Sequence, residues 1–140
     1  MISIVCWKWK PENKAKHEQK RQKFSIRHIN ILRAMVERNL TLDHQFVCVS
    51  QKWKGLHSYI KWVSVDEYFS EYKELGGCYR RLKAFHQETA ERHFGEGKFV
   101  SIDLDCVITD KIDSIIWFRE DFRIWGDEYR RFTPYCGRLW

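Results

Sequence analysis

The chain has 140 residues, of which 44% are hydrophobic and 31% are charged, and its formal net charge at pH 7 is +6. The length suits one compact domain, and an apolar fraction close to the globular average excludes a disordered chain. Two prolines and seven glycines exclude collagen-like and linker-like chains. Because no apolar run approaches about 18 residues, we expect no membrane span.

The first half of the chain predicts three strands and one amphipathic helix. Ile2–Trp7 is a short, apolar, β-branched run, typical of a buried strand rather than a signal peptide, because no basic segment precedes it. Over Ile26–Leu40, apolar residues recur at spacings of three and four, which predicts a helix with one buried face. Gln45–Ser50 predicts a second buried strand and Tyr59–Val65 a weaker third one.

The second half predicts further helices and strands, with glycines after the first two helices, where a helix commonly ends. In chain order these elements are a short helix (Asp66–Leu75), a long helix (Cys78–Phe94), a strand (Phe99–Leu104), a short helix (Ile112–Phe118) and a strand (Phe122–Trp125). The overall order predicts an α/β fold with a mixed, mostly parallel sheet flanked by helices. Such sheets bind ligands at the carboxyl ends of their strands, and here no glycine-rich phosphate loop is present.

The positive charge is concentrated near the N-terminus. Residues 1–27 hold eight basic and two acidic residues, whereas residues 28–140 hold 17 of each. A duplex-binding domain usually spreads Lys and Arg over one face of its fold. A basic segment just after the first strand is either a solvated loop or a segment that meets an anion at the strand end.

The five cysteines are far apart in the sequence, and none forms a C-x-x-C pair. This spacing argues against a zinc ribbon or a dithiol redox motif. A reducing, cytoplasmic setting is the simplest interpretation of an odd number of separated cysteines.

Two aspartates follow the predicted strand at Phe99–Leu104. If that strand continues, Asp103 and Asp105 point to the same side, with carboxylates roughly 7 Å apart. Two such oxygen ligands suit magnesium or manganese, whose coordination substrate phosphates complete. The alternative is an ordinary acidic turn after a strand. We interpret Asp110 and Asp113 as capping residues of the next helix.

A basic cluster, Tyr79-Arg80-Arg81-Leu82-Lys83, opens the predicted long helix. Arg80 and Lys83 are three apart and share a helix face, whereas Arg81 points elsewhere. An arginine directed at the strand ends could bind a diphosphate through two parallel hydrogen bonds. For Arg80 we favour a solvated face paired with glutamates of the same helix.

Several segments together resemble one enzyme family. Residues 79–83, 98–108 and 110–115 are similar to retaining glycosyltransferases of the glycogenin and bacterial lipooligosaccharide galactosyltransferase type. In that family a tyrosine-x-arginine-leucine helix precedes a strand that ends in a D-x-D motif. The remaining segments resemble a phage and bacterial subgroup of the family: residues 4–10 (with the run Cys6-Trp7-Lys8-Trp9), 39–41, 46–49, 122–127 and 133–135.

The resemblance implies a GT-A fold, which is Rossmann-like, a manganese (or magnesium) cofactor and a nucleotide-diphosphate sugar of the uridine or guanosine type as donor. It also implies retention of the anomeric configuration. By motif position, Asp103 contacts ribose and metal, Asp105 ligates the metal, and Arg81 touches the diphosphate or the sugar. The donor-binding residues that the resemblance implies are Cys6, Trp7, Lys8, Arg81, Asp103, Leu104 and Asp105.

The resemblance also sets expectations for the end of the chain. Relatives continue beyond the point equivalent to Trp140, and that part supplies most of the acceptor site and a histidine as third metal ligand. Cys136-Gly137 stands where the family usually has asparagine-glycine. We therefore expect residues 1–140 to form a single donor-binding domain whose acceptor part is short or missing. The acceptor, the catalytic residue and the oligomeric state, a homo-oligomer included, stay open.

Three classes of function remain after these arguments. The first is a hexosyltransferase-like enzyme, or a reduced relative that still binds a nucleotide sugar. The second is a nucleic-acid-binding protein or metal-dependent nuclease, which the neutral remainder of the chain argues against. The third is an interaction module that kept the fold and lost the chemistry.

Overall fold

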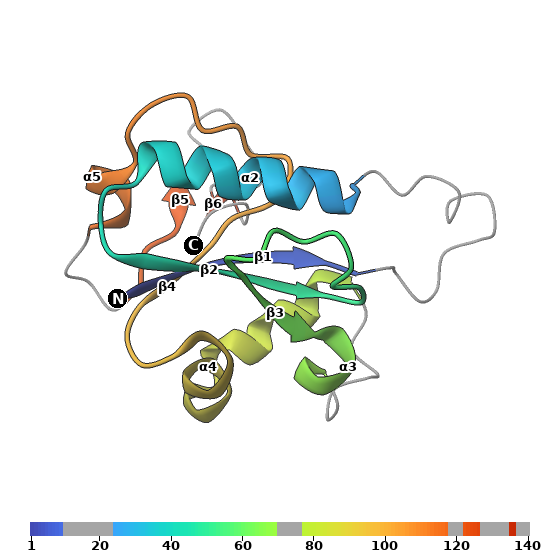
Figure 1. Ribbon diagram of the computed structural model, residues 1–140. Helices are drawn as coiled ribbons and strands as arrows, with labels where there is room; N and C mark the ends of the chain where they lie inside the picture. The colour runs from blue at the N-terminus through green and yellow to red at the C-terminus, as the bar shows by residue number, and fades with distance from the viewer. Residues whose placement is uncertain (10–23, 70–76, 118–121, 127–134, 137–140) are drawn as a thin grey trace.

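The computed structural model describes residues 1–9, 24–69, 77–117, 122–126 and 135–136. Its main sheet has four strands in the order β3-β2-β1-β4, and all neighbouring strands are parallel (Figure 1). These strands are β1 (Ile2–Lys8), β2 (His44–Ser50), β3 (Ile60–Ser64) and β4 (Phe99–Ser101). The α/β class is confirmed, and the described sheet is wholly parallel rather than mixed. It is compatible with a Rossmann-like fold.

A separate two-stranded antiparallel sheet lies later in the chain. It joins β5 (Trp125–Gly126) to β6 (Tyr135–Cys136). Of the predicted strand at Phe122–Trp125, the structure retains the last residue only, because residues 122–124 lie outside any strand.

Strand β1 is central in the main sheet. It pairs with β2 along its whole length, from Ile2 opposite His44 to Lys8 opposite Ser50. On its other side it pairs with β4, from Ser3 opposite Phe99. A parallel strand covered on both faces is expected to be apolar throughout, which accounts for the continuous run that begins the chain. Because the strands are parallel, their carboxyl ends meet at one edge of the sheet.

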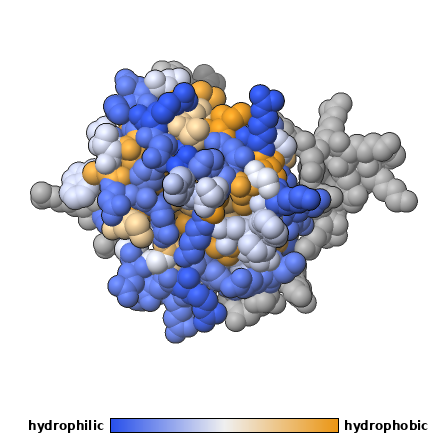
Figure 2. Space-filling model, in the orientation of Figure 1, coloured by the Kyte–Doolittle hydropathy of each residue, from blue (hydrophilic) through white to orange (hydrophobic). Residues whose placement is uncertain are grey.

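Helices cover both faces of the sheet, so the domain has three layers (Figure 1). On one face α2 (Ile26–Asn39) runs along the strands, and α5 (Asp113–Ile116) packs on the same side. The other face carries α3 (Val65–Tyr68), the 3-10 helix η1 (Gly77–Phe85) and α4 (Gln87–Phe94). Figure 2 shows hydrophilic side chains over most of the visible surface, with smaller apolar areas between them.

The core consists of two clusters, one on each face of the sheet. Along β1, Ile4 and Cys6 pack toward α2, whereas Val5 and Trp7 pack toward α3 and α4. This alternation is the ordinary two-residue period of a strand. Deleting most of a fully buried side chain such as Ile29 of α2 typically costs about 2–5 kcal/mol.

Hydrogen bonds fix both ends of α2. At its start the Ser25 amide donates to Nδ1 of His28 over 3.0 Å. Just beyond its end, the Asp113 carboxylate accepts the amide of Thr41 at 2.9 Å, the Thr41 hydroxyl at 2.6 Å and the Leu42 amide at 3.2 Å. Asp113 therefore ties α5 to the connection between α2 and β2, in addition to standing first in its own helix.

The predicted helix over Cys78–Phe94 is wrong as a single element. The structure divides it into η1 and α4, with an extended residue, His86, between them. Leu82 and Phe85, which a single helix would place along one face, are 57% and 52% exposed, whereas Arg80 is buried. A 3-10 helix repeats every three residues, so a different set of side chains turns toward the sheet than in an α-helix.

The predicted strand at Phe99–Leu104 is also shorter than expected. Its ladder ends at Ser101, and Ile102 adds one bridging bond from its amide to the Val5 carbonyl, 2.9 Å away. The chain then turns, and the Cys106 amide donates to the Asp103 carbonyl over 3.1 Å. The prediction that Asp103 and Asp105 lie on one side of a strand is therefore wrong, because both belong to this turn.

Some expectations fall outside the described residues. These are the later parts of the two predicted short helices, residues 70–75 and 118, and most of the basic segment after the first strand, residues 10–23.

Candidate functional site

The carboxyl edge of the sheet brings together residues that are far apart in the chain. Asp103 leaves the sheet directly after Ile102, beside the end of β1. Arg81, which lies on η1, reaches this edge and forms an ion pair with the Asp103 carboxylate. The two side chains are 21% and 22% exposed, so this pair is partly shielded from water yet still accessible.

Arg81 has two further constraints. Its guanidinium carbon lies 5.7 Å from the ring centroid of Trp9, within the usual range of a cation–π contact. Its Nε atom is buried and has no hydrogen-bond partner among the described residues. Arg81 is thus held between an aromatic face and a carboxylate, at the edge where an α/β sheet usually binds its ligand.

Aromatic rings pack beside this ion pair. Trp7 is 5% exposed, and its indole N–H donates to the Ser101 hydroxyl over 2.7 Å. The Trp9 ring lies edge-on to Trp7 at 6.0 Å and to Phe69 at 5.2 Å between centroids. The guanidinium carbon of Arg80 is 5.4 Å from the Phe69 centroid. The solvated face expected for Arg80 is therefore wrong, since this cation is buried against an aromatic ring.

The other predicted donor-binding residues have mixed placements. The Cys6 side chain is fully buried on the α2 side of the sheet, and burial raises the pKa of its thiol. The Leu104 side chain packs against the same core, and Lys8 is half-buried at the end of β1. Like Trp7, Cys6 can offer a ligand its backbone only.

Asp105 is exposed on the turn that follows Asp103. Carboxylate oxygens of these two residues have the chemistry that magnesium or manganese prefers, and such ions commonly bind through one or two carboxylates plus substrate phosphates. Within residues 1–9, 24–69, 77–117, 122–126 and 135–136, no group of three or more His, Cys, Asp or Glu could hold a metal. The donor set fits a hard divalent cation only if the substrate supplies the other ligands.

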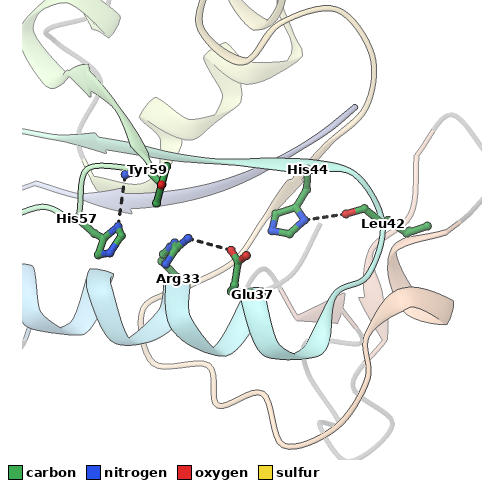
Figure 3. A network of polar contacts seen from close by, with 6 residues as sticks. All are labelled: Arg33, Glu37, Leu42, His44, His57 and Tyr59. Atoms are coloured by element: carbon green, nitrogen blue, oxygen red, sulfur yellow. Dashed lines mark hydrogen bonds and ion pairs between the residues drawn. The ribbon is translucent and has the colours of Figure 1, made fainter.

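A second polar network lies along α2 (Figure 3). Arg33 and Glu37 form an ion pair of 3.0 Å one turn apart, and the Arg33 guanidinium lies 5.5 Å from the Tyr59 ring centroid. The Tyr59 amide lies 3.4 Å from Nδ1 of His57. These contacts fasten the connection between β2 and β3 to α2, which is a structural role.

Arg81 and Asp103 were predicted as binding residues and lie together in the structure, but the groups around them were not predicted. The contact of Trp9 with Arg81 joins residues 72 positions apart, and that of Arg80 with Phe69 joins residues 11 positions apart in different elements. The only available signal was the density of aromatic residues near residues 7–9 and 68–69. This signal shows that aromatic rings are abundant in these segments, but it does not predict which residues they contact.

Comparisons with protein-family models, curated proteins and solved structures found no match for this chain. Among the helices that the structure describes, none is long and apolar enough to cross a membrane. The observations thus define an α/β protein with a parallel sheet and a basic, acidic and aromatic cluster at its carboxyl edge.

Proposed function

We propose that this chain binds a nucleotide-diphosphate sugar at the carboxyl edge of its sheet and acts as a retaining glycosyltransferase. The observation that carries the proposal is the meeting of Arg81 with Asp103 beside the end of β1. Open parallel sheets flanked by helices bind nucleotides at this edge, and the chain has no glycine loop to hold phosphates. Charged side chains are needed for that task instead.

In this proposal each group at the edge has a distinct role. Arg81 binds the diphosphate, for which its planar guanidinium is well suited. Asp103 and Asp105 hold the divalent cation, which would neutralise charge on the departing diphosphate. The partly exposed Trp9 ring offers a flat apolar surface for a base or a sugar ring. No described side chain is assigned as a nucleophile.

Sugar transfer requires this site to stabilise the negative charge that develops on the leaving diphosphate. A fixed cation in a partly shielded place does this without reorganising at the moment of reaction. Arg81 suits that requirement because its guanidinium lies over the Trp9 ring and pairs with Asp103 in a partly shielded place.

A second candidate is a protein that binds the nucleotide sugar without transferring it. The small number of metal-binding side chains favours this alternative, since the described residues include no group of three or more His, Cys, Asp or Glu that could hold a metal ion. The two candidates share the same binding site and differ in whether sugar leaves the nucleotide.

Calorimetry and thermal unfolding with uridine and guanosine diphosphate sugars, with and without Mn²⁺, test the binding. We expect a manganese-dependent rise in melting temperature that Asp105→Asn abolishes. Asp43→Asn is the matched control, because Asp43 is an exposed aspartate just before β2, at the opposite edge of the sheet. Release of free sugar or nucleoside diphosphate then distinguishes transfer or hydrolysis from binding alone. If no nucleotide sugar stabilises the protein, the proposal is wrong.

A further inference from the structure

We propose that the Arg81–Asp103 ion pair is an internal latch, which makes the binding of a divalent cation and of a diphosphate at this edge depend on each other. The inference rests on the proposed function and deepens it, since it concerns how the same site is loaded. Its starting observation is that Arg81 and Asp103, both predicted to bind ligand, are paired with each other in the structure.

The geometry makes this pair costly to separate without replacement. Each side chain is only about one-fifth exposed, so water screens the charges incompletely. The Arg81 guanidinium also lies over the Trp9 ring, which keeps it close to Asp103. Removing the partner of a shielded charge leaves that charge uncompensated, and this cost exceeds what the pair itself contributes.

A cation and a diphosphate each compete with one half of the pair. A cation that binds Asp103 draws the carboxylate away from Arg81, and a diphosphate that binds Arg81 draws the guanidinium away from Asp103. Either ligand alone therefore separates the pair and leaves one partner without its counter-charge. When both bind, each side chain exchanges one opposite charge for another.

The consequence is positive coupling between the two ligands. The first ligand to bind bears the cost of opening the pair, and the second finds its own side chain already released. By linkage, each must raise the affinity of the other by the same factor. The latch also keeps the site from holding a bare cation or a bare phosphate group tightly.

The distinguishing test substitutes one residue of the ion pair and measures the affinity of the ligand that binds the other residue. Arg81→Met is expected to bind Mn²⁺ alone more tightly than the unmodified chain, by about two- to five-fold, the range that a partly exposed ion pair supports. Lys83→Met is the matched control: it removes the same charge two residues away, from a side chain that lies over the Tyr68 ring. It is expected to leave the Mn²⁺ affinity unchanged.

The reciprocal measurement uses inorganic pyrophosphate with a chelator present to remove metal. Asp103→Asn is expected to bind pyrophosphate more tightly by a similar factor, whereas Asp110→Asn, an exposed aspartate beyond the turn, is expected to bind it unchanged. Near-ultraviolet circular dichroism checks that all four variants are folded. Calorimetry then gives the affinities without any need for turnover.

The outcomes separate the latch from the function on which it rests. If Mn²⁺ and pyrophosphate bind, but Arg81→Met and Asp103→Asn bind their remaining ligands no more tightly than the controls do, the latch is wrong and the site stands. If Mn²⁺ and pyrophosphate bind no folded variant, even when both are present together, the proposed function itself fails. Tighter binding in both variants and in neither control supports the latch.

Discussion

The Tyr68 hydroxyl is the clearest place to test the physical account of the core. The residue is 0% exposed, and its hydroxyl has no hydrogen-bond partner within the residues that the structure describes. Burial also raises the pKa of the phenol well above its ordinary value. The ring itself packs well, with centroids 4.8 Å from Phe69, 5.5 Å from Trp7 and 5.3 Å from His93.

Tyr68→Phe should therefore stabilise the protein. A buried polar group without a partner costs about 1–3 kcal/mol, and the substitution removes that group while keeping the ring contacts. Phenylalanine also retains the surface that faces Lys83, whose Nζ lies 5.7 Å from the ring centroid. We expect a gain of about 1 kcal/mol in the free energy of unfolding, which corresponds to about 3 °C in melting temperature for a chain of this size.

Urea unfolding followed by circular dichroism measures this gain directly. Tyr59→Phe is the control, because Tyr59 is 76% exposed and its hydroxyl can reach water, so no change is expected. A loss of about 1 kcal/mol in Tyr68→Phe, or no change at all, would refute the reasoning, since either result means that the buried hydroxyl is satisfied in solution.

Three further predictions concern titration and reactivity. The hydroxyl and amide of Thr41 hold the pKa of Asp113 below its usual value. Asp113→Asn should therefore lower the melting temperature at pH 7, and the difference from the unmodified chain should shrink as pH falls below about 4. A difference that stays constant with pH would show that the charge of Asp113 does not contribute to stability. Burial lowers the pKa of His93, and the opposing effect of the Glu67 carboxylate does not reverse this shift. Its neutral form contributes stability above about pH 6.5 that is lost as pH falls, and His93→Gln should flatten the melting temperature between pH 7 and pH 5. Cys6 and Cys48 are 0% exposed, so at most three of the five thiols should react with Ellman's reagent before unfolding; rapid reaction of four would contradict their burial.

The parts of the fold that could be predicted from the sequence are those with a strong local pattern. The first strand is a continuous apolar run, and α2 has apolar residues at helical spacing, so the predicted bounds of both agree with the structure to within one residue. The region Cys78–Phe94 failed because an α-helical period and a 3-10 period produce similar patterns over two turns. In the structure Arg80, rather than Leu82, turns inward, where its guanidinium lies against Phe69 of a different element.

In the candidate site, too, local patterns could be predicted and distant contacts could not. The residue type at a strand end pointed to Asp103, the resemblance to a glycosyltransferase family pointed to Arg81, and the structure brings these two together. The geometry of Asp103 and Asp105 could not be read from their spacing, because the end of β4 depends on where its pairing with β1 ends, after Val5 and Ser101. That is a contact between residues almost one hundred positions apart, which no local pattern encodes.

The central position of β1 has a consequence for how the chain folds during its synthesis. Strand β1, which is synthesised before both of its neighbours, gains one of them when residues 44–50 emerge and the other only when residues 99–101 do. Until then one edge of an apolar strand stays open, and such edges readily pair with other chains. Folding dominated by such distant pairings is slow. A nascent chain that pauses before residue 99 should therefore be prone to aggregate, whereas one that pauses after residue 117 should already protect β1.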